Sequence, residues 1–139
     1  MQTVPLDRDK PDRAALERII AYARRDKVLI FPEGHRSPNG RMQAGKEGVV
    51  LIARRSNVPL VPVAIYGTEG GPIPLLLHKK TLGVIMGEPF RLPPGLSRDE
   101  ALTFIMGRIA ELLPEQYRPL PAEITTTGVP ATATATHRQ

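Results

Sequence analysis

The spacing of apolar residues predicts a chain that alternates helices with short buried strands. After Asp12, which suits a helix N-cap, apolar residues recur every three or four positions, so we expect a helix over residues 13–25. Residues 28–31 form a continuous apolar run that ends at Pro32. Such short runs are typical of strands buried on both faces. The first part of the chain therefore predicts a helix followed by a buried strand.

The same alternation continues toward the middle of the chain. Residues 46–55 place Val, Ile and Ala at helical period among charged residues, and Asn57 suits the C-terminal end of that helix. Residues 60–66 predict a second buried strand. Pro62 lies inside it and cannot donate to a ladder, so we expect the strand to be irregular or at an edge there.

The C-terminal third predicts one more strand, one more helix and a tail. Residues 81–86 form a short apolar run after a loop rich in Gly and Pro. Ser97 and Glu100 have the spacing of a capping box, which predicts a helix from there to about residue 113. From residue 122 onward Thr and Ala alternate with little charge. We expect a domain over residues 1–121 and a disordered tail over residues 122–139.

This order of elements predicts an α/β fold. Helices between strands that are apolar on both faces favour a small, largely parallel sheet flanked by helices. Three strands make a thin sheet, and each strand of this kind needs neighbours to cover it. The length of 139 residues suits one domain of this type.

Composition removes several classes of site. The chain has no cysteine, which excludes disulfides, thiolate catalysis and cysteine-ligated metals. Its net charge of +5 suits either an ordinary domain with a modest basic excess or a surface that meets anionic lipid or a phosphorylated substrate. No basic run with interleaved aromatics indicates nucleic-acid binding. No apolar stretch approaches the ~20 residues of a membrane-spanning helix. We therefore expect a cytoplasmic protein, with any membrane contact peripheral and on the inner face.

Two sequence blocks carry the chemical information. Residues 31–37 read FPEGHRS, and residues 58–63 read VPLVPV. Together they resemble the third and fourth conserved blocks of the glycerolipid acyltransferase family, whose members acylate lysophosphatidate and related lysolipids. The resemblance covers residues 1–92 and implies a partial domain of that family. It implies an acyltransferase of phospholipid biosynthesis, with a lysophosphatidate-like acceptor, and acyl-CoA or acyl-carrier protein as donor.

The resemblance also implies which residues hold the acceptor. In the first block an Arg offers a planar fork for a phosphate, Gly34 permits close approach of backbone to a ligand, and Ser37 offers another hydrogen bond. The alternative is that Glu33 and Arg36 simply pair with each other in a loop. Arg8 and Lys46 match further family positions, with solvated charges as the alternative. The predicted acceptor- or phosphate-binding residues are Glu33, Gly34, Arg36, Ser37, Arg8 and Lys46.

The second block is expected to shape the wall of the acyl pocket. Its alternative role is that of a core strand, and the two roles are compatible. The residues predicted to form this wall are Val58, Pro59, Val61 and Pro62.

The catalytic block of the family is missing from the sequence. That block is a His followed five positions later by an Asp, whereas His35 and His78 are followed at that distance by glycines, and His137 lies too close to the end. His35 could be a substitute base, but no carboxylate at the proper spacing would orient it. No cluster of His, Asp and Glu has the spacing of metal ligands, and no cofactor is expected.

Three hypotheses follow from this pattern. In the first, the chain is the acceptor-binding half of an acyltransferase, and a partner segment or upstream residues supply the His–Asp block. In the second, it is a non-catalytic remnant that binds anionic lipid or phosphate without turnover. In the third and weakest, it is an interaction domain that has kept no ligand. The sequence leaves open whether the chain is an enzyme.

Overall fold

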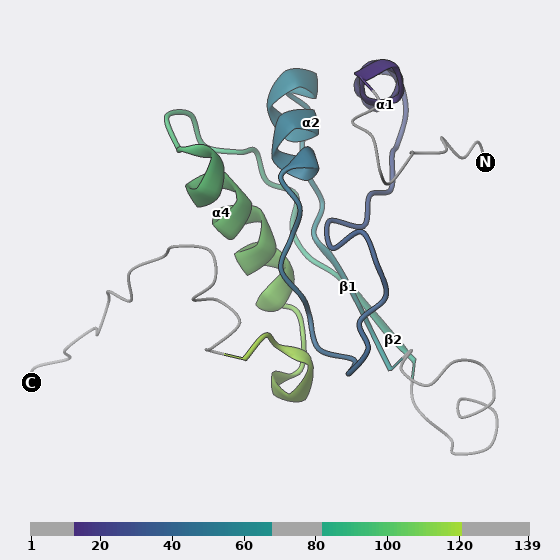
Figure 1. Cartoon of the computed structure of the whole chain (residues 1–139), viewed down its shortest axis with the longest axis vertical. Coiled ribbons are helices and arrows are strands. Elements are labelled where there is room, and N and C mark those ends of the chain that lie inside the picture. Colours follow the sequence, from purple (N-terminus) through teal and green to yellow (C-terminus); the bar gives the residue numbers. More distant parts are fainter. Residues whose placement is uncertain (1–12, 68–81, 121–139) are drawn as a thin grey trace, which may run out of the picture.

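The computed structural model of the chain describes residues 13–67 and 82–120 (Figure 1). Arg8, most of the predicted Gly/Pro-rich loop and the predicted tail lie outside these residues. The described part has three α-helices, a two-stranded sheet and one short 3-10 helix, η1 (Glu115–Tyr117). It is a small α/β arrangement, as the pattern of elements predicted.

The first two helices form close to where the apolar spacing placed them. Helix α1 spans Arg13–Ala23 and α2 spans Gly48–Ser56. Asn57 ends α2 in the left-handed conformation with φ of 53°, and its N–H donates to the carbonyl of Ala53 at 3.0 Å. Asn tolerates this conformation better than most residues, which explains the stop at this point.

Helix α4 (Arg98–Ala110) begins with the predicted capping box. The N–H of Glu100 donates to Ser97 Oγ at 3.2 Å, and the N–H of Ser97 donates to the Glu100 carboxylate at 2.7 Å. Two N–H groups at the helix N-terminus are thereby satisfied. These hydrogen bonds lower the pKa of Glu100, because they favour its charged form.

The sheet differs from the prediction, because its two strands are antiparallel. Strand β1 (Val63–Tyr66) pairs with β2 (Gly83–Met86), with Val63 opposite Met86 and Tyr66 opposite Gly83. The prediction of a largely parallel sheet is therefore wrong for the described residues. A parallel pair would need the strand expected at residues 28–31, which has no regular secondary structure here. Residues 63–66 pair instead with the next strand along the chain, and such consecutive strands readily pair antiparallel.

The predicted irregularity at Pro62 is confirmed. Leu60 and Phe90 form an isolated antiparallel bridge, each donating its N–H to the other's carbonyl at 2.8 Å. Between this bridge and the first pair of the hairpin, the β1 side has two residues and the β2 side has three. The extra residue of this bulge therefore lies opposite the segment that contains Pro62. Pro62 has no N–H to donate, and its carbonyl accepts from the N–H of Gly87 at 2.9 Å.

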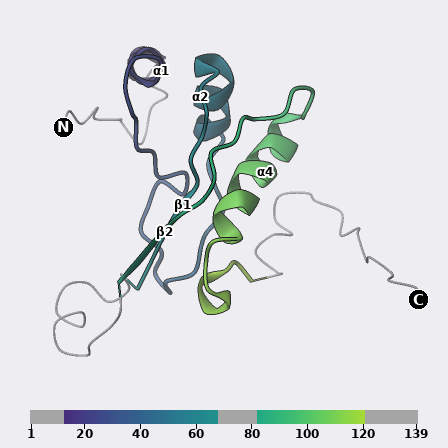
Figure 2. The same ribbon diagram turned by 180° about the vertical axis from the view of Figure 1, so that it is seen from behind.

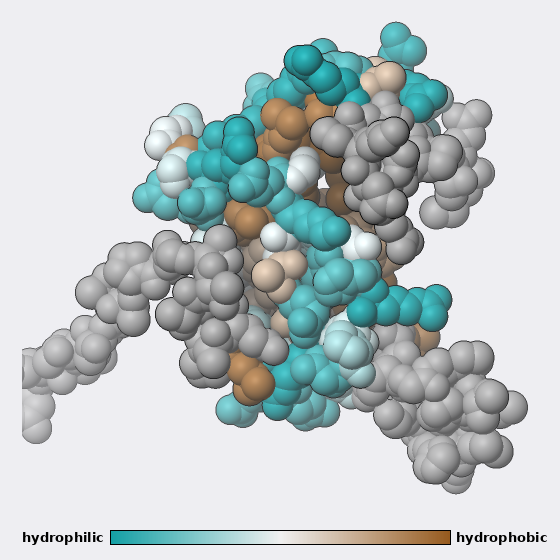
Figure 3. All heavy atoms as spheres, in the orientation of Figure 1, coloured by the Kyte–Doolittle hydropathy of each residue, from teal (hydrophilic) through white to brown (hydrophobic). Residues whose placement is uncertain are grey.

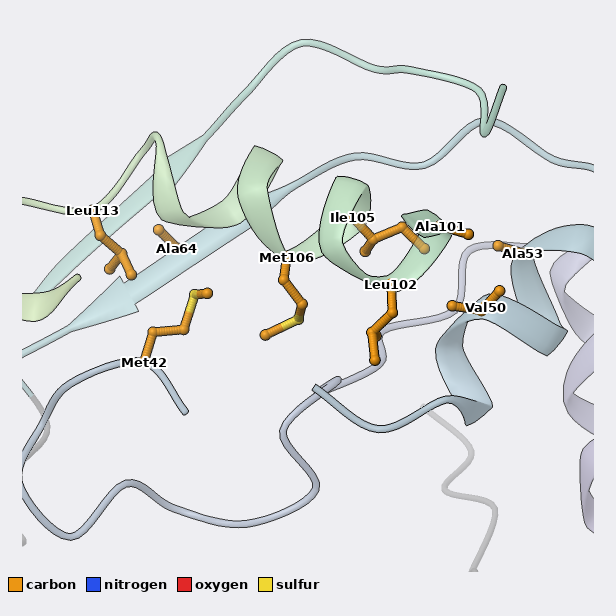
Figure 4. Packing of buried hydrophobic residues seen from close by; sticks show 9 residues of the cluster. All are labelled: Met42, Val50, Ala53, Ala64, Ala101, Leu102, Ile105, Met106 and Leu113. Atoms are coloured by element: carbon orange, nitrogen blue, oxygen red, sulfur yellow. The ribbon is translucent and has the colours of Figure 1, made fainter. Parts of the chain in front are cut away.

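The hydrophobic core fills the space between α2, α4 and one face of the sheet (Figure 4). In Figures 1 and 2, α4 lies along one side of the strand pair. Tyr66 and Tyr117 extend the core with their rings 5.2 Å apart. The buried residues of this cluster are Met42, Val50, Ala53, Ala64, Ala101, Leu102, Ile105, Met106 and Leu113.

A second, smaller cluster joins α1 to α2. Ile19 and Ile20 of α1 pack with Ile52 of α2, and Ile30 is partly buried against them. The two clusters fix α1 and α2 and thereby the two ends of the segment between them, which carries the first sequence block. None of the described helices combines the length and apolarity needed to cross a membrane.

Candidate functional site

The loop of residues 31–37 is tied to the segment that precedes α2. Within the loop, the N–H of Gly34 donates to the carbonyl of Phe31 at 3.1 Å and closes a turn. The N–H of Lys46 donates to the carbonyl of Pro32 at 2.8 Å. Residues 31–34 and 43–46 thus lie side by side, although the sequence separates them by a turn.

Glu33 makes the second tie between these segments. Its carboxylate accepts a hydrogen bond from the N–H of Gln43 at 2.7 Å. The side chain is partly buried, and this desolvation raises the pKa of Glu33; the hydrogen bond from Gln43 and the nearby His35 oppose the rise. The alternative pair with Arg36 is not formed. Glu33 therefore joins two backbone segments within the described structure.

Lys46 lies over Gly34. Gly34 has a φ of 73°, in the left-handed region that favours glycine. A Cβ built on Gly34 would come within 3.0 Å of Lys46 Cε and 3.2 Å of its Nζ. Because Gly34 has no side chain, the Lys46 side chain can lie close to the backbone of Gly34. The structure brings these two predicted residues together, and it places the ammonium beside the backbone of the loop.

Arg36 and Lys46 have no side-chain partner within the described residues, unlike most of the arginines there. Within the described residues neither side chain makes a hydrogen bond or an ion pair, and both are exposed. By contrast, Arg55 pairs with Glu17, and Arg98 pairs with Glu47 at 2.9 Å. Two uncompensated cations therefore accompany one loop, which makes it a favourable place for an anion.

Ser37 takes part in the turn that follows. Its hydroxyl donates to Asn39 Oδ1 at 2.9 Å, and the N–H of Arg41 donates to the same oxygen at 3.0 Å. Gly40 completes this turn with a φ of 77°. Sequence reasoning missed Asn39 and Gln43 as supports of the loop. The position of Asn39 inside a Pro-Asn-Gly turn is the signal that could have indicated its role.

The residues of the second block have different surroundings. Pro62 is buried, and a Cβ on Gly87 would lie 2.9 Å from it and 3.1 Å from Leu112. Pro59 and Val61 are exposed, and Val58 is half-buried. The role of this block as a core segment therefore holds for Pro62, while its exposed residues remain candidates for the acyl-pocket wall.

The histidine of the first block has no orienting carboxylate at hydrogen-bond distance. His35 is exposed and acts on Glu33 through its charge, but no hydrogen bond joins the two side chains in the described structure. Among residues 13–67 and 82–120, no group of three His, Asp or Glu side chains is placed to hold a metal ion.

Comparison with known proteins agrees with the two blocks. The family model described as "Acyltransferase" matches residues 1–66. The chain is 34% identical over 98 residues to the chloroplastic 1-acyl-sn-glycerol-3-phosphate acyltransferase BAT2 of Brassica napus. The matched region covers 60% of this chain and 28% of that protein. It is 32% identical over 115 residues to the 1-acyl-sn-glycerol-3-phosphate acyltransferase of Bacillus subtilis. This matched region covers 78% of the present chain and 56% of the relative.

A third relative supports the same assignment. The chain is 40% identical over 69 residues to a 1-acyl-sn-glycerol-3-phosphate acyltransferase of Cocos nucifera, covering 46% of this chain and 22% of that protein. The chain thus spans between about a fifth and somewhat over half of the length of these relatives. No solved structure matches it. The family match and these relatives support the assignment of this chain to the glycerolipid acyltransferase family.

Proposed function

We propose that this chain is the acceptor-binding part of a lysophosphatidate acyltransferase of phospholipid biosynthesis. The names of its relatives support the reaction class and the acceptor. The observation that carries the assignment to this part of the chain is the loop of residues 31–37 with the adjoining Lys46, because Arg36 and Lys46 are both exposed and have no side-chain partner within the described residues. A doubly charged phosphate monoester suits such a pair of cations.

The two cations have different roles in this proposal. Arg36 holds the acceptor's phosphate with two parallel hydrogen bonds, which a guanidinium can form and an ammonium cannot. Lys46 supplies a point charge beside Gly34, where the absence of a side chain keeps the ammonium close to the backbone. Glu33 and Ser37 hold the loop through Gln43 and Asn39.

The reaction also needs groups that this sequence does not contain. A base takes the proton from the acceptor's hydroxyl, and that oxygen bonds to the carbonyl carbon of an acyl thioester. The tetrahedral oxyanion then collapses, the carbon–sulfur bond breaks, and the leaving thiolate takes up a proton. The donor is acyl-CoA or acyl-carrier protein. Because the acceptor is a membrane lipid, we propose peripheral contact with a membrane surface.

A second candidate function rests on a different observation. None of the three histidines of the sequence is followed five positions later by Asp. A chain that keeps the phosphate-holding loop without this block would bind anionic lipid or phosphate without turnover. The two candidates share the ligand and differ in whether an acyl group is transferred.

The binding test uses lysophosphatidate as the probe in a calorimetric titration of the full chain. We expect Arg36→Ala and Lys46→Ala each to weaken binding by roughly tenfold or more, because hydrogen bonds to charged groups contribute about 1.5–3 kcal/mol. Arg98→Ala is the matched control, since Arg98 is an exposed arginine paired with Glu47. Equal affinities in all four proteins would refute the assignment of the acceptor site.

Turnover separates the two candidates. With radiolabelled acyl-CoA and lysophosphatidate, the chain alone should transfer no acyl group, because it lacks an oriented base. Measurable transfer that disappears in His35→Ala would contradict this expectation and make His35 the base.

A further inference from the structure

The charges of the described residues are divided unevenly along the chain. Residues 13–67 carry ten Lys and Arg side chains against four Asp and Glu, whereas residues 82–120 carry four against five. The positive excess therefore belongs to the part of the fold that contains α1, α2 and the loop of residues 31–37. At the top of Figure 3, the surface over α1 and α2 is accordingly mainly hydrophilic.

The excess is densest in α1 and the turn that follows it. Residues 13–27 contain five cations and two anions. Glu17 pairs with Arg55 at the end of α2, and Arg24 donates to the carbonyl of Arg55. The second anion, Asp26, accepts from the backbone N–H of Lys27. The other cations of this segment are exposed and make no side-chain hydrogen bond or ion pair within the described residues; they are Arg13, Arg18, Arg25 and Lys27.

Two of these cations flank an aromatic side chain along α1. Arg18, Tyr22 and Arg25 are four and three positions apart, the spacing that makes side chains neighbours on one side of a helix. The helical path continues past the last residue of α1, because the N–H of Asp26 donates to the carbonyl of Tyr22 at 2.8 Å. All three side chains are exposed, Tyr22 to 43%. We call these three residues the α1 stripe.

The apolar neighbours of the cations indicate the class of partner. Tyr22 lies between the two arginines of the α1 stripe, and Leu29, two residues after Lys27, is 58% exposed. A soluble polyanion requires only cations, whereas a bilayer surface offers anionic headgroups beside an apolar layer. Tyr is enriched at membrane–water interfaces, because its ring is apolar and its hydroxyl is polar. The combination therefore fits a surface of anionic lipid.

The same segment leads directly into the loop that we propose holds the acceptor's phosphate. The first block begins at Phe31, four residues after Lys27, so at most about 14 Å separates their Cα atoms. The carbonyl of Phe31 accepts from the N–H of Gly34 inside the loop. An acceptor with an acyl chain is held at a membrane surface by that chain. A protein that binds the phosphate of such an acceptor works at that surface.

We propose that the α1 stripe, together with Lys27, docks the protein on a bilayer of anionic phospholipid. The inference rests on the proposed function, of which it names the membrane-facing surface. The attraction needs no fixed hydrogen-bond geometry, and each Lys or Arg near an anionic surface strengthens binding about fivefold. Docking through this side of α1 holds the loop of residues 31–37 near the headgroups, where the acceptor's phosphate lies.

The test measures binding of the full chain to vesicles by flotation. One set of vesicles contains phosphatidylcholine and phosphatidylglycerol in equal parts, and the other contains phosphatidylcholine alone. We expect binding to the anionic set only. Binding should be lost as NaCl rises from about 0.1 to about 1 M, because the screening length falls from about 10 to about 3 Å.

Substitutions in the α1 stripe locate the contact. The double variant Arg18→Gln, Arg25→Gln should bind the anionic vesicles roughly twentyfold or more weakly, because it removes two contributions of about fivefold each. Arg18→Lys, Arg25→Lys keeps both charges and should bind like the parent. Tyr22→Ala should weaken binding to vesicles, which contact with a soluble polyanion would not require.

A charge-matched control keeps the result specific. Arg91→Gln, Arg98→Gln also removes two exposed arginines, which contact the carbonyl of Asn57 and the carboxylate of Glu47. This control should keep most of the binding to anionic vesicles. Circular dichroism melts show whether each variant is folded. If Arg18→Gln, Arg25→Gln is not folded, the single variant Arg18→Gln takes its place, with an expected loss of about fivefold.

Each of four outcomes would overturn the proposal. They are no binding to the anionic vesicles, equal binding to both sets of vesicles, equal losses in the double variant and the charge-matched control, and binding to polyglutamate as tight as to the anionic vesicles. The last outcome would make the partner an acidic polypeptide.

A parallel titration with lysophosphatidate in solution separates this inference from the proposed function. If Arg36→Ala loses affinity for lysophosphatidate but the double variant keeps its binding to vesicles, the docking surface alone fails. If the double variant loses its binding to vesicles but Arg36→Ala keeps its affinity for lysophosphatidate, the proposed acceptor site alone fails.

Discussion

Replacing Gly34 by Ala tests whether the left-handed glycine and the lysine above it act as one unit. The change has two separable costs. An L-residue at a φ of 73° is strained by roughly 1–2 kcal/mol, which lowers the free energy of unfolding. The new Cβ would also lie 3.0 Å from Lys46 Cε. Carbon atoms prefer about 3.5–4.0 Å, so the side chain must move by roughly 0.5–1 Å.

The second cost falls on ligand binding and not on stability. The contact is with the far end of a flexible side chain, which can move at little cost to the fold. Its ammonium is then displaced from the loop, and a lost charge-assisted hydrogen bond to phosphate corresponds to roughly tenfold weaker binding. We therefore expect Gly34→Ala to lower both stability and affinity for lysophosphatidate.

Gly95→Ala is the matched control for this experiment. Gly95 has a φ of 83°, so alanine is strained there to a similar degree, but a Cβ would meet nothing within 4 Å. Urea unfolding followed by circular dichroism measures stability, and calorimetric titration measures affinity. Both variants should lose similar stability, and only Gly34→Ala should lose affinity. Equal lysophosphatidate affinity in the two variants would refute a binding role for the contact between Gly34 and Lys46.

Two further predictions concern stability. Burial raises the pKa of Glu33, so the folded state holds the proton of this carboxyl more tightly than the unfolded state does. The free energy of unfolding therefore falls as pH rises from the ordinary pKa of about 4.5 through the higher pKa of the folded state. Glu33→Gln keeps an acceptor for Gln43, so urea unfolding from pH 4 to 7 should show the parent losing stability relative to the variant; parallel curves would contradict this. Ser97→Ala should cost about 0.5–2 kcal/mol by removing the N-cap of α4, whereas a loss within error would show that the capping box contributes little.

The helices could be predicted because their signals are local. Apolar spacing, the capping box of Ser97 and Glu100, and the αL stop at Asn57 all act within one or two turns of chain. The bulge at Pro62 is local too, since a residue without an N–H cannot join a regular ladder wherever the strand lies. These features were therefore in the right places before any tertiary contact was considered.

The pairing of strands could not be predicted in the same way. Whether residues 60–66 pair with residues 28–31 or with β2 depends on contacts between segments far apart in sequence, and each partner has a suitable apolar pattern. The parallel arrangement was the wrong choice between two partners that the pattern alone cannot distinguish. The exposure of Val84 and Met86 in β2 has the same origin, because a pattern that is apolar on both faces does not show which layers cover a strand.

The features of the candidate site also separate into those that the sequence predicts and those that only the fold decides. The sequence alone indicated the family, through one short block whose residue types suit a phosphate and a second, apolar block, and it showed that no histidine is followed five positions later by Asp. Only the tertiary structure decided that Lys46 lies over Gly34, that Glu33 binds the backbone of Gln43, and that Arg36 has no partner among the described residues. The physical reason is that residue types limit which interactions can form, whereas the folded backbone decides which groups come within reach of each other.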